Sequence, residues 1–315
     1  MENFLWLVAG LILLVWGGEL LVKGAVALSL KVKLSRMVIG MTVVSFATSL
    51  PELIVSLMAG LSGHPDISLS NVVGSNIANI GLVLGLTALL MPIAVKRVSY
   101  VFNWPGMMII SFMLYYFLVN DQMLSAPEGM VLFVFLLFFV FFIIRHSYKT
   151  GDVLLDEVNE ELDNKPHGKI IFWLIAGAFV LWLGSKWLLN GAVGLARDYG
   201  ISERIIGISM IAVGTSIPEL AASLISAYRK ERDISLGNLI GSNIFNIGSV
   251  LGITAIIHPI ANFDHALLDK DILWMLLLSF LVIPLAWLPQ KNMINRWKGA
   301  LFLILYIVFI ITTFS

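Results

Sequence analysis

Long apolar runs alternate with short polar segments along nearly the whole chain. Ten of these runs are each long enough for a helix to cross the core of a bilayer, which takes roughly 20 apolar residues. They cover about residues 4–28, 37–60, 68–92, 98–119, 129–145, 170–197, 204–227, 234–258, 271–288 and 299–314. Transmembrane β-strands would instead show short segments of alternating polarity. The pattern therefore predicts an all-α polytopic membrane protein with ten transmembrane helices in contact with the lipid bilayer.

Composition agrees with this class. Of the 315 residues, 59% are hydrophobic and 13% are charged, and the mean hydropathy is +0.93. Soluble domains carry roughly 25% charged residues, so a soluble enzyme is excluded. Lys and Arg balance Asp and Glu at 20 each, which leaves no net positive charge for binding nucleic acid. The chain has no cysteine, so disulfides and thiolate metal sites are excluded as well.

Basic residues predict the orientation of the chain in the membrane. With ten spans, the loops on the side opposite the termini hold 15 Lys and Arg, and the loops on the other side hold three. Because cytoplasmic loops retain Lys and Arg, both termini are predicted to be extracytoplasmic. The acidic segment 146–169 would then be a solvated cytoplasmic linker, since it lacks the alternating ligand pattern of an EF-hand.

The two halves of the chain resemble each other. Residues 24–94 align without a gap on residues 191–261, with 34 identities in 71 positions. Each half holds five predicted spans, an odd number, so the second half is predicted to be inverted in the membrane. We therefore expect one five-helix repeat at 1–145, the linker at 146–169, and an inverted five-helix repeat at 170–315. Inverted repeats with a polar site at their interface are typical of secondary transporters.

Two acidic residues lie at matching depth in the repeats. Glu52 and Glu219 fall near the middle of the second and seventh predicted spans, where a carboxylate costs about 2.5 kcal/mol or more unless it is paired or hydrated. No Lys or Arg is repeated beside them. The expected counter-charge is therefore a bound cation.

Oxygen-bearing residues surround these glutamates in both repeats. Pro51 has no N–H to bond the carbonyl of Ala47, so the helix is expected to kink and release that carbonyl, and the second repeat has the same arrangement. Hydroxyl and amide residues on the flanking positions complete the candidate set. Besides the glutamates, the set contains Thr48, Ser49, Ser75, Asn79, Thr215, Ser216, Ser242 and Asn246, with Asn76 and Asn243 close by.

This set has no imidazole or sulfur donor. Oxygen-only sites suit small inorganic cations such as calcium, sodium or protons rather than zinc or copper. No resident cofactor is expected, and the absence of a nucleophile–base pair argues against an enzyme.

The repeated motifs resemble those of the cation/calcium exchanger superfamily. They read ATSLPEL and GSNIANIG in the first repeat, and GTSIPEL and GSNIFNIG in the second. The chain most resembles the short prokaryotic sodium/calcium exchanger-like members. The resemblance implies that Glu52 and Glu219 are the principal calcium ligands, that the remaining set completes the calcium and sodium sites, and that the first and sixth helices slide across the other eight.

One departure from the family bears on the transported ions. Some members carry Asp where this chain has Asn246, so the site holds two formal negative charges and potassium co-transport is less favoured. The expected function is sodium/calcium antiport in the cell membrane. A calcium/proton antiporter that uses the same glutamates is the nearest alternative, and a cation channel is an alternative of a different class.

Overall fold

A computed structural model describes residues 2–63, 65–150, 162, 165–200, 214–261, 263–288 and 292–314. Within these residues the protein is mostly helical, and eight helices are long and apolar enough to cross a membrane. A ninth candidate results if the helices on either side of Ser49 are counted as one bent span. The predicted span at 204–227 lies partly outside the described residues. A polytopic helical protein is therefore confirmed, and the count of ten and the inversion of the repeats stay predictions.

The chain divides into two compact units that do not coincide with the two sequence repeats. The first unit contains Met1–Thr48 and Ser147–Asn238, and the second contains Ser49–His146 and Leu239–Ser315. Each unit thus draws segments from both halves of the sequence. Most of the predicted linker at 146–169 lies outside the described residues.

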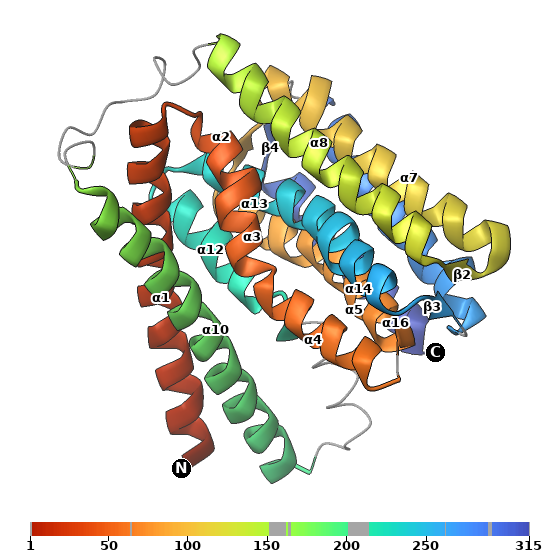
Figure 1. Ribbon diagram of the computed structural model, residues 1–315. Coiled ribbons are helices and arrows are strands. Elements are labelled where there is room, and N and C mark those ends of the chain that lie inside the picture. The colour runs from red at the N-terminus through yellow and green to blue at the C-terminus, as the bar shows by residue number, and fades with distance from the viewer. Residues whose placement is uncertain are drawn as a thin grey trace. The chain divides into compact units, whose positions relative to one another are not determined.

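The first unit is built around two long helices, α1 and α10, which lie side by side (Figure 1). Its described elements are α1 (Glu2–Val32), α2 (Arg36–Ile39), the π-helix η1 (Gly40–Val44), α3 (Ser45–Thr48), α10 (His167–Asp198), α12 (Ile217–Tyr228) and the first half of α13 (Arg232–Phe245).

Glycines let the backbones of α1 and α10 touch. They recur every seven residues on both helices, at Gly10, Gly17, Gly24, Gly177, Gly184 and Gly191. A Cβ atom added at Gly17 would lie 2.7 Å from the backbone nitrogen of Leu181, and one added at Gly177 would lie 2.6 Å from that of Leu21. Any side chain at these positions would push the helices apart, so the close pairing requires glycine.

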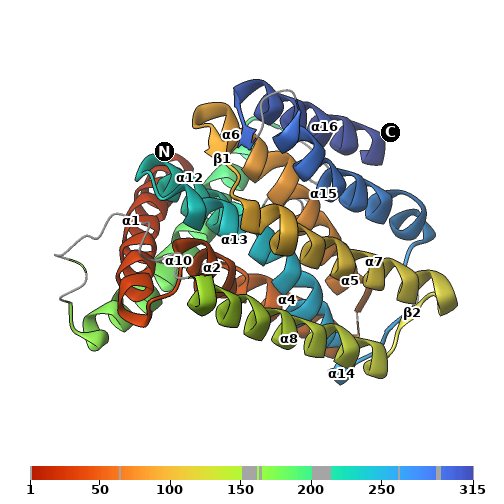
Figure 2. The same ribbon diagram turned by 90° about the horizontal axis from the view of Figure 1, so that it is seen from above.

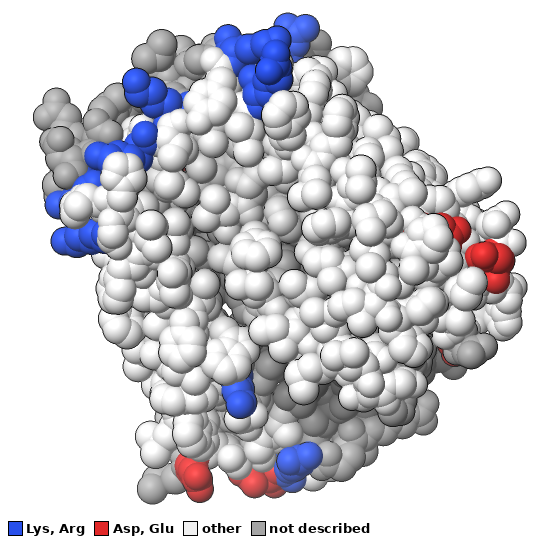
Figure 3. All heavy atoms as spheres, viewed as in Figure 1, with Lys and Arg blue, Asp and Glu red and all other residues white. Residues whose placement is uncertain are grey.

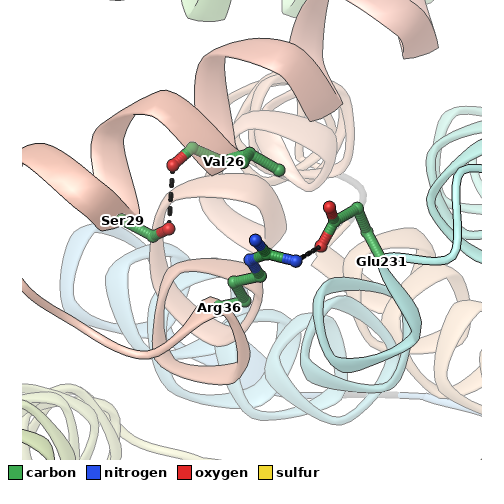
Figure 4. Close-up of polar contacts among 4 residues, drawn as sticks. All are labelled: Val26, Ser29, Arg36 and Glu231. Carbon is green, nitrogen blue, oxygen red and sulfur yellow. Dashed lines mark hydrogen bonds and ion pairs between the residues drawn. The ribbon is translucent and has the colours of Figure 1, made fainter. Parts of the chain in front are cut away.

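Ion pairs join the helix ends of the first unit. Nη1 of Arg36 lies 2.7 Å from Oε2 of Glu231, which precedes α13, and both side chains are mostly buried (Figure 4). Arg229 makes a bidentate pair with Glu19 at 2.6 and 2.8 Å. The ammonium of Lys23, one turn further along α1 than Glu19, lies over the ring of Trp173. The hydrogen bond and charge of Glu19 raise the pKa of Arg229.

A hydrogen bond within one helix is found in the last turns of α1 (Figure 4). The hydroxyl of Ser29 donates to the carbonyl of Val26 at 2.8 Å. This bond lets a buried serine face the apolar interior of the unit without an unsatisfied hydroxyl.

The second unit contains the second half of α13 and the remaining elements, of which only the last residues of α8 belong to the first unit. They are α4 (Leu50–Leu61), α5 (Pro65–Ala78), η2 (Asn79–Leu84), α6 (Gly85–Leu90), β1 (Ile93–Ala94), η3 (Ser99–Asn103), α7 (Trp104–Asp121), β2 (Met123–Leu124), α8 (Ala126–Thr150), η5 (Asn246–Leu251), α14 (Gly252–Ile257), β3 (Ile260–Ala261), η6 (Leu267–Asp271), α15 (Ile272–Trp287), β4 (Met293–Ile294) and α16 (Arg296–Phe314). Helix α16 packs on α6 and α15 (Figure 2).

Two short antiparallel ladders, which the all-α prediction did not include, connect loops of the second unit. Strand β1 pairs with β4 through Ile93 and Ile294, and β2 pairs with β3 through Leu124 and Ile260. All four of these residues are buried. The ladders satisfy backbone groups where the chain leaves its helices, which buried loops require.

Local structure repeats at the same offset as the sequence. The succession of α5, η2, α6 and β1 has its counterpart 167 residues later in α13, η5, α14 and β3. Helices α4 and α12 correspond in the same way, with 12 residues each. In these segments the two repeats thus form the same succession of secondary structure.

The outer surface is dominated by apolar side chains. Most of the face drawn in Figure 3 carries no Lys, Arg, Asp or Glu, and large apolar residues such as Phe138 on α8 and Phe172 on α10 are more than half exposed. Exposed apolar area on this scale would drive a soluble protein to aggregate, so the surface fits a lipid environment.

Candidate functional site

The ten candidate residues are distributed over both units. Ser49, Glu52, Ser75, Asn79, Ser242 and Asn246 lie in the second unit, and Thr48, Thr215, Ser216 and Glu219 lie in the first. All except Thr215, which is partly exposed, are buried. For such polar residues in a membrane protein, complete burial requires hydrogen bonds or a bound ion.

The two glutamates occupy equivalent local positions. Glu52 lies in the first turn of α4 and Glu219 in the first turn of α12, and both side chains are 0% exposed. Pro51 and Pro218 stand in the same first turns, where a missing N–H costs no helical bond. The partial positive charge of a helix N-terminus stabilises a carboxylate placed there.

Each glutamate helix is preceded by a non-helical serine. The residues before the helices, Ser49 and Ser216, have φ of −85° and −86° and ψ of 2° and are not helical. The prediction that proline interrupts the helix is confirmed for Pro51, where the helices before and after Ser49 are bent by 44°, and the segment that precedes Gly214 in the second repeat lies outside the described residues. Of the carbonyls expected to be released, that of Gly214 accepts a hydrogen bond of 3.2 Å from the hydroxyl of Ser185, so one of its lone pairs is already used.

In the first unit, Asn238 holds residues of the broken helix. Its Oδ1 accepts from the hydroxyl of Thr48 at 3.2 Å, its backbone carbonyl accepts from Ser45 at 2.9 Å, and its Nδ2 donates to Ser223 at 3.1 Å. Asn238 and Ser223 were not among the site residues predicted from the sequence. Their identity with Asn71 and Ser56 in the other repeat was the available signal.

The same pair of residue types interacts in the second unit. Nδ2 of Asn71 lies 3.3 Å from Oγ of Ser56, and the hydroxyl of Ser68 donates to the carbonyl of Ser56 at 2.6 Å. These bonds link α5 to α4, the helix that carries Glu52 in its first turn. Both repeats therefore brace the glutamate helix against the following helix through an asparagine and a serine.

Asn79 and Asn246 each begin a π-helical segment, η2 and η5. Such segments interrupt the regular α-helical bonding and are frequent at functional sites. Nδ2 of Asn79 donates to Oδ1 of Asn243, and Nδ2 of Asn246 donates to Oδ1 of Asn76, both at 3.1 Å. The structure therefore places the four asparagines in one network in the second unit.

Several buried oxygen atoms of the candidate set lack a hydrogen-bond partner among the described residues. They are Oδ1 of Asn79, Oδ1 of Asn246 and Oγ of Ser242 in the second unit, and Oγ of Ser216 in the first. Buried acceptors without a donor are rare and need an explanation. Within the second unit, a cation that accepts electron pairs from Asn79, Ser242 and Asn246 supplies one.

The chemistry of the donors restricts the type of cation. In the part of the chain that the structure covers, no three His, Cys, Asp or Glu side chains are grouped as a transition-metal site would require. The candidates instead offer carboxylate, amide and hydroxyl oxygens. These ligands bind hard cations such as calcium and sodium.

Comparison with known proteins gives consistent matches over the whole chain. The family model described as sodium/calcium exchanger protein matches residues 2–145 and 169–315. The putative antiporter CaxA of Alkalimonas amylolytica is 38% identical over 316 residues, which cover 99% of this chain and 98% of that protein. The sodium/calcium exchanger MaX1 of Methanosarcina acetivorans is 30% identical, with 99% and 98% of the two chains covered.

The structure is also similar to a solved one. The sodium-calcium exchanger NCX_Mj, soaked with 2.5 mM Na⁺ and 0.1 mM Ca²⁺, matches with a TM-score of 0.79 and 30% sequence identity. The match covers 99% of this chain and 98% of that chain. Similarity of this extent in both sequence and structure covers every helix described above.

Proposed function

The chain belongs to the sodium/calcium exchanger protein family, and from this premise we propose that it exchanges calcium for sodium across the membrane by alternating access. Family membership, apolar helices and a buried set of oxygen ligands agree with a cation antiporter that performs no enzymatic chemistry.

The observation that carries the proposal is the pair of repeat-related glutamates. Glu52 and Glu219 are both 0% exposed, and both stand in the first turn of a helix that a non-helical serine precedes. A calcium ion carries the charge needed to neutralise two carboxylates, and so do two sodium ions. Either ion can therefore replace the other, as antiport requires.

We assign the ten candidate residues as follows. Glu52 and Glu219 act as the principal calcium ligands, and Asn79, Asn246, Ser216 and Ser242 contribute the buried oxygens that have no partner within the described residues. The remaining candidates, Thr48, Ser49, Ser75 and Thr215, complete the calcium and sodium ligands. Calcium accepts six to eight oxygens in general, which this set can supply.

Sodium is favoured over protons by the named relatives. MaX1 and NCX_Mj are both described as sodium/calcium exchangers, whereas CaxA is described only as a putative antiporter. A proton-coupled exchanger would use the same two glutamates as proton carriers.

The test is calcium uptake into proteoliposomes that contain the purified protein. We expect uptake when the vesicles are loaded with sodium and diluted into sodium-free buffer, and none when sodium is equal on both sides. Uptake driven by a pH gradient at zero sodium would instead establish proton coupling. Calcium flux without any counter-ion would indicate a channel and contradict antiport.

Substitution of the glutamates tests the assignment of the site. Glu52→Gln and Glu219→Gln keep the side-chain shape but remove the charge, so each is expected to abolish calcium exchange. Glu128→Gln is a matched control, because Glu128 accepts a hydrogen bond from the backbone of Ser125 at the start of α8 and has no proposed role in transport. Full exchange activity in both site variants would refute the assignment.

We place the protein in the cell membrane with both termini extracytoplasmic, on the basis of the 15 basic residues in one set of predicted loops and three in the other. The chain contains no cysteine, so single cysteines can be introduced without background. In intact cells, a membrane-impermeant thiol reagent is expected to label Glu2→Cys and to leave Lys149→Cys unlabelled. The reverse pattern would contradict the orientation.

A further inference from the structure

Asn76 and Asn243 form a reciprocal pair in the second unit. Nδ2 of Asn76 donates to the backbone carbonyl of Asn243 at 3.2 Å, and Nδ2 of Asn243 donates to the backbone carbonyl of Asn76 at 3.3 Å. Each amide nitrogen also lies near a methionine sulfur, Met275 at 3.7 Å for Asn76 and Met107 at 3.8 Å for Asn243. Both side chains are buried.

The backbone carbonyls decide which way these two amides face. A carbonyl oxygen only accepts hydrogen bonds, so the NH₂ group of each asparagine has to face it. Rotating either amide by 180° would bring its Oδ1 against a carbonyl oxygen and leave two buried acceptors in contact. The orientation of Asn76 and Asn243 is therefore determined by the main chain and does not depend on a bound ion.

The orientation of Asn76 and Asn243 in turn determines the orientation of Asn79 and Asn246. Because Oδ1 of Asn243 faces Asn79, it can only accept, and Asn79 has to present its NH₂ group at 3.1 Å. Asn246 is held by Oδ1 of Asn76 in the same way. The amide oxygens of Asn79 and Asn246 consequently face away from the network, and both are buried without a hydrogen-bond partner within the described residues.

We propose that Asn76 and Asn243 are positioning residues that hold Asn79 and Asn246 with their amide oxygens, and not their NH₂ groups, available to the transported cation. The inference rests on the proposed function, in which Asn79 and Asn246 are ligands. An amide that rotated would present two N–H donors to a cation, which repel it. The network thus fixes which end of each of these two uncharged amides faces the cation.

The positioning role makes a prediction that a structural role does not make. An aspartate at position 79 has an oxygen at both ends, so it needs no partner to orient it. Removing the amide of Asn243 should therefore harm calcium binding when residue 79 is the native asparagine and should harm it little after Asn79→Asp. A purely structural contribution of Asn243 would give the same loss in both backgrounds.

The experiment is a double-mutant cycle on the full-length purified protein, with ⁴⁵Ca²⁺ binding in detergent and thermal stability measured for each variant. Asn243→Leu is compared with the native protein, and the same change is compared in a variant that also carries Asn79→Asp. Loss of an outer residue that orients a metal ligand typically weakens binding about 10–100-fold. We expect a loss of about 10-fold or more with Asn79 and no more than about 2-fold with Asn79→Asp.

Controls keep the outcomes distinct. Asn103→Leu removes another buried asparagine of the second unit, one outside the network, and should leave calcium affinity unchanged. If Asn243→Leu does not fold, Asn243→Ser replaces it, since serine is small and too short to hold Asn79.

Equal losses in both backgrounds would overturn the positioning role while leaving the proposed function intact. The proposed function fails on a different result, namely no calcium binding by the native protein, and this inference would then fail with it.

Discussion

The contact between α1 and α10 can be tested by adding one methyl group. A Cβ atom at Gly177 would lie 2.6 Å from the backbone nitrogen of Leu21 and 3.0 Å from the carbonyl oxygen of Gly17. The first distance falls short of ordinary van der Waals contact by about 0.8 Å. Both neighbours are backbone atoms, so no side chain can rotate away, and Gly177→Ala must separate the helices.

The size of the effect follows from two opposing contributions. Overpacking of this kind costs roughly 1–3 kcal/mol, and the upper half of the range applies because separating the helices also loosens the neighbouring glycine contacts. Alanine is more favourable than glycine within a helix by about 1 kcal/mol. The net expectation for Gly177→Ala is a loss of roughly 1–2 kcal/mol in the free energy of unfolding, which corresponds to about 2–4 °C in the melting temperature.

The assay is thermal unfolding of the purified protein in detergent, followed by size-exclusion chromatography. Gly168→Ala is the matched control, because it lies on the same helix and its added Cβ would meet nothing within 4 Å. This control should melt at or slightly above the native temperature. A melting temperature for Gly177→Ala equal to that of the control would refute the direct backbone contact between the helices.

Two further predictions concern polar contacts that join elements within a unit. Removing the carboxylate with Glu231→Gln leaves Arg36, whose side chain is 14% exposed, without this ion pair, and should cost roughly 1–3 kcal/mol of stability. The charge exchange Arg36→Glu with Glu231→Arg should restore part of that loss, and no recovery would contradict a direct pair. Trp104→Phe removes the indole N–H that donates to the carbonyl of Ser279 at 2.8 Å and should lower the free energy of unfolding by about 1 kcal/mol. Trp16→Phe, at an exposed position, should change the melting temperature little. Equal shifts in the two variants would count against the hydrogen bond.

Much of this architecture can be derived from the order of residues along the chain. Apolar runs located the helices to within a few residues, as α10 at His167–Asp198 shows against the expected 170–197. The repeat correctly singled out Glu52 and Glu219 as a buried acidic pair, and Pro51 follows the predicted break in its helix. These features depend on local hydrophobicity and backbone chemistry, which a sequence states directly.

Other features could have been found in the sequence but were not used. The spacing of seven residues between Gly10, Gly17 and Gly24 recurs in α10 and marks the face of each helix that touches the other. Asn238 was likewise visible as one of the repeated identities. The spacing alone does not say which helix each glycine faces, because partners more than 150 residues apart are chosen by packing.

The polarity of the asparagine network depended on tertiary structure alone. A sequence shows four repeated asparagines but not which end of each amide faces outward. The orientation of the amides follows from the backbone carbonyls of Asn76 and Asn243. Each carbonyl comes within hydrogen-bonding distance of a side chain from the other repeat only when α5 and α13 pack together. Composition and periodicity were sufficient for a membrane protein with a buried, repeated, oxygen-rich site, because burial and helix breaking are local properties. The direction in which each buried oxygen points is set by contacts between distant segments, and only the folded chain contains them.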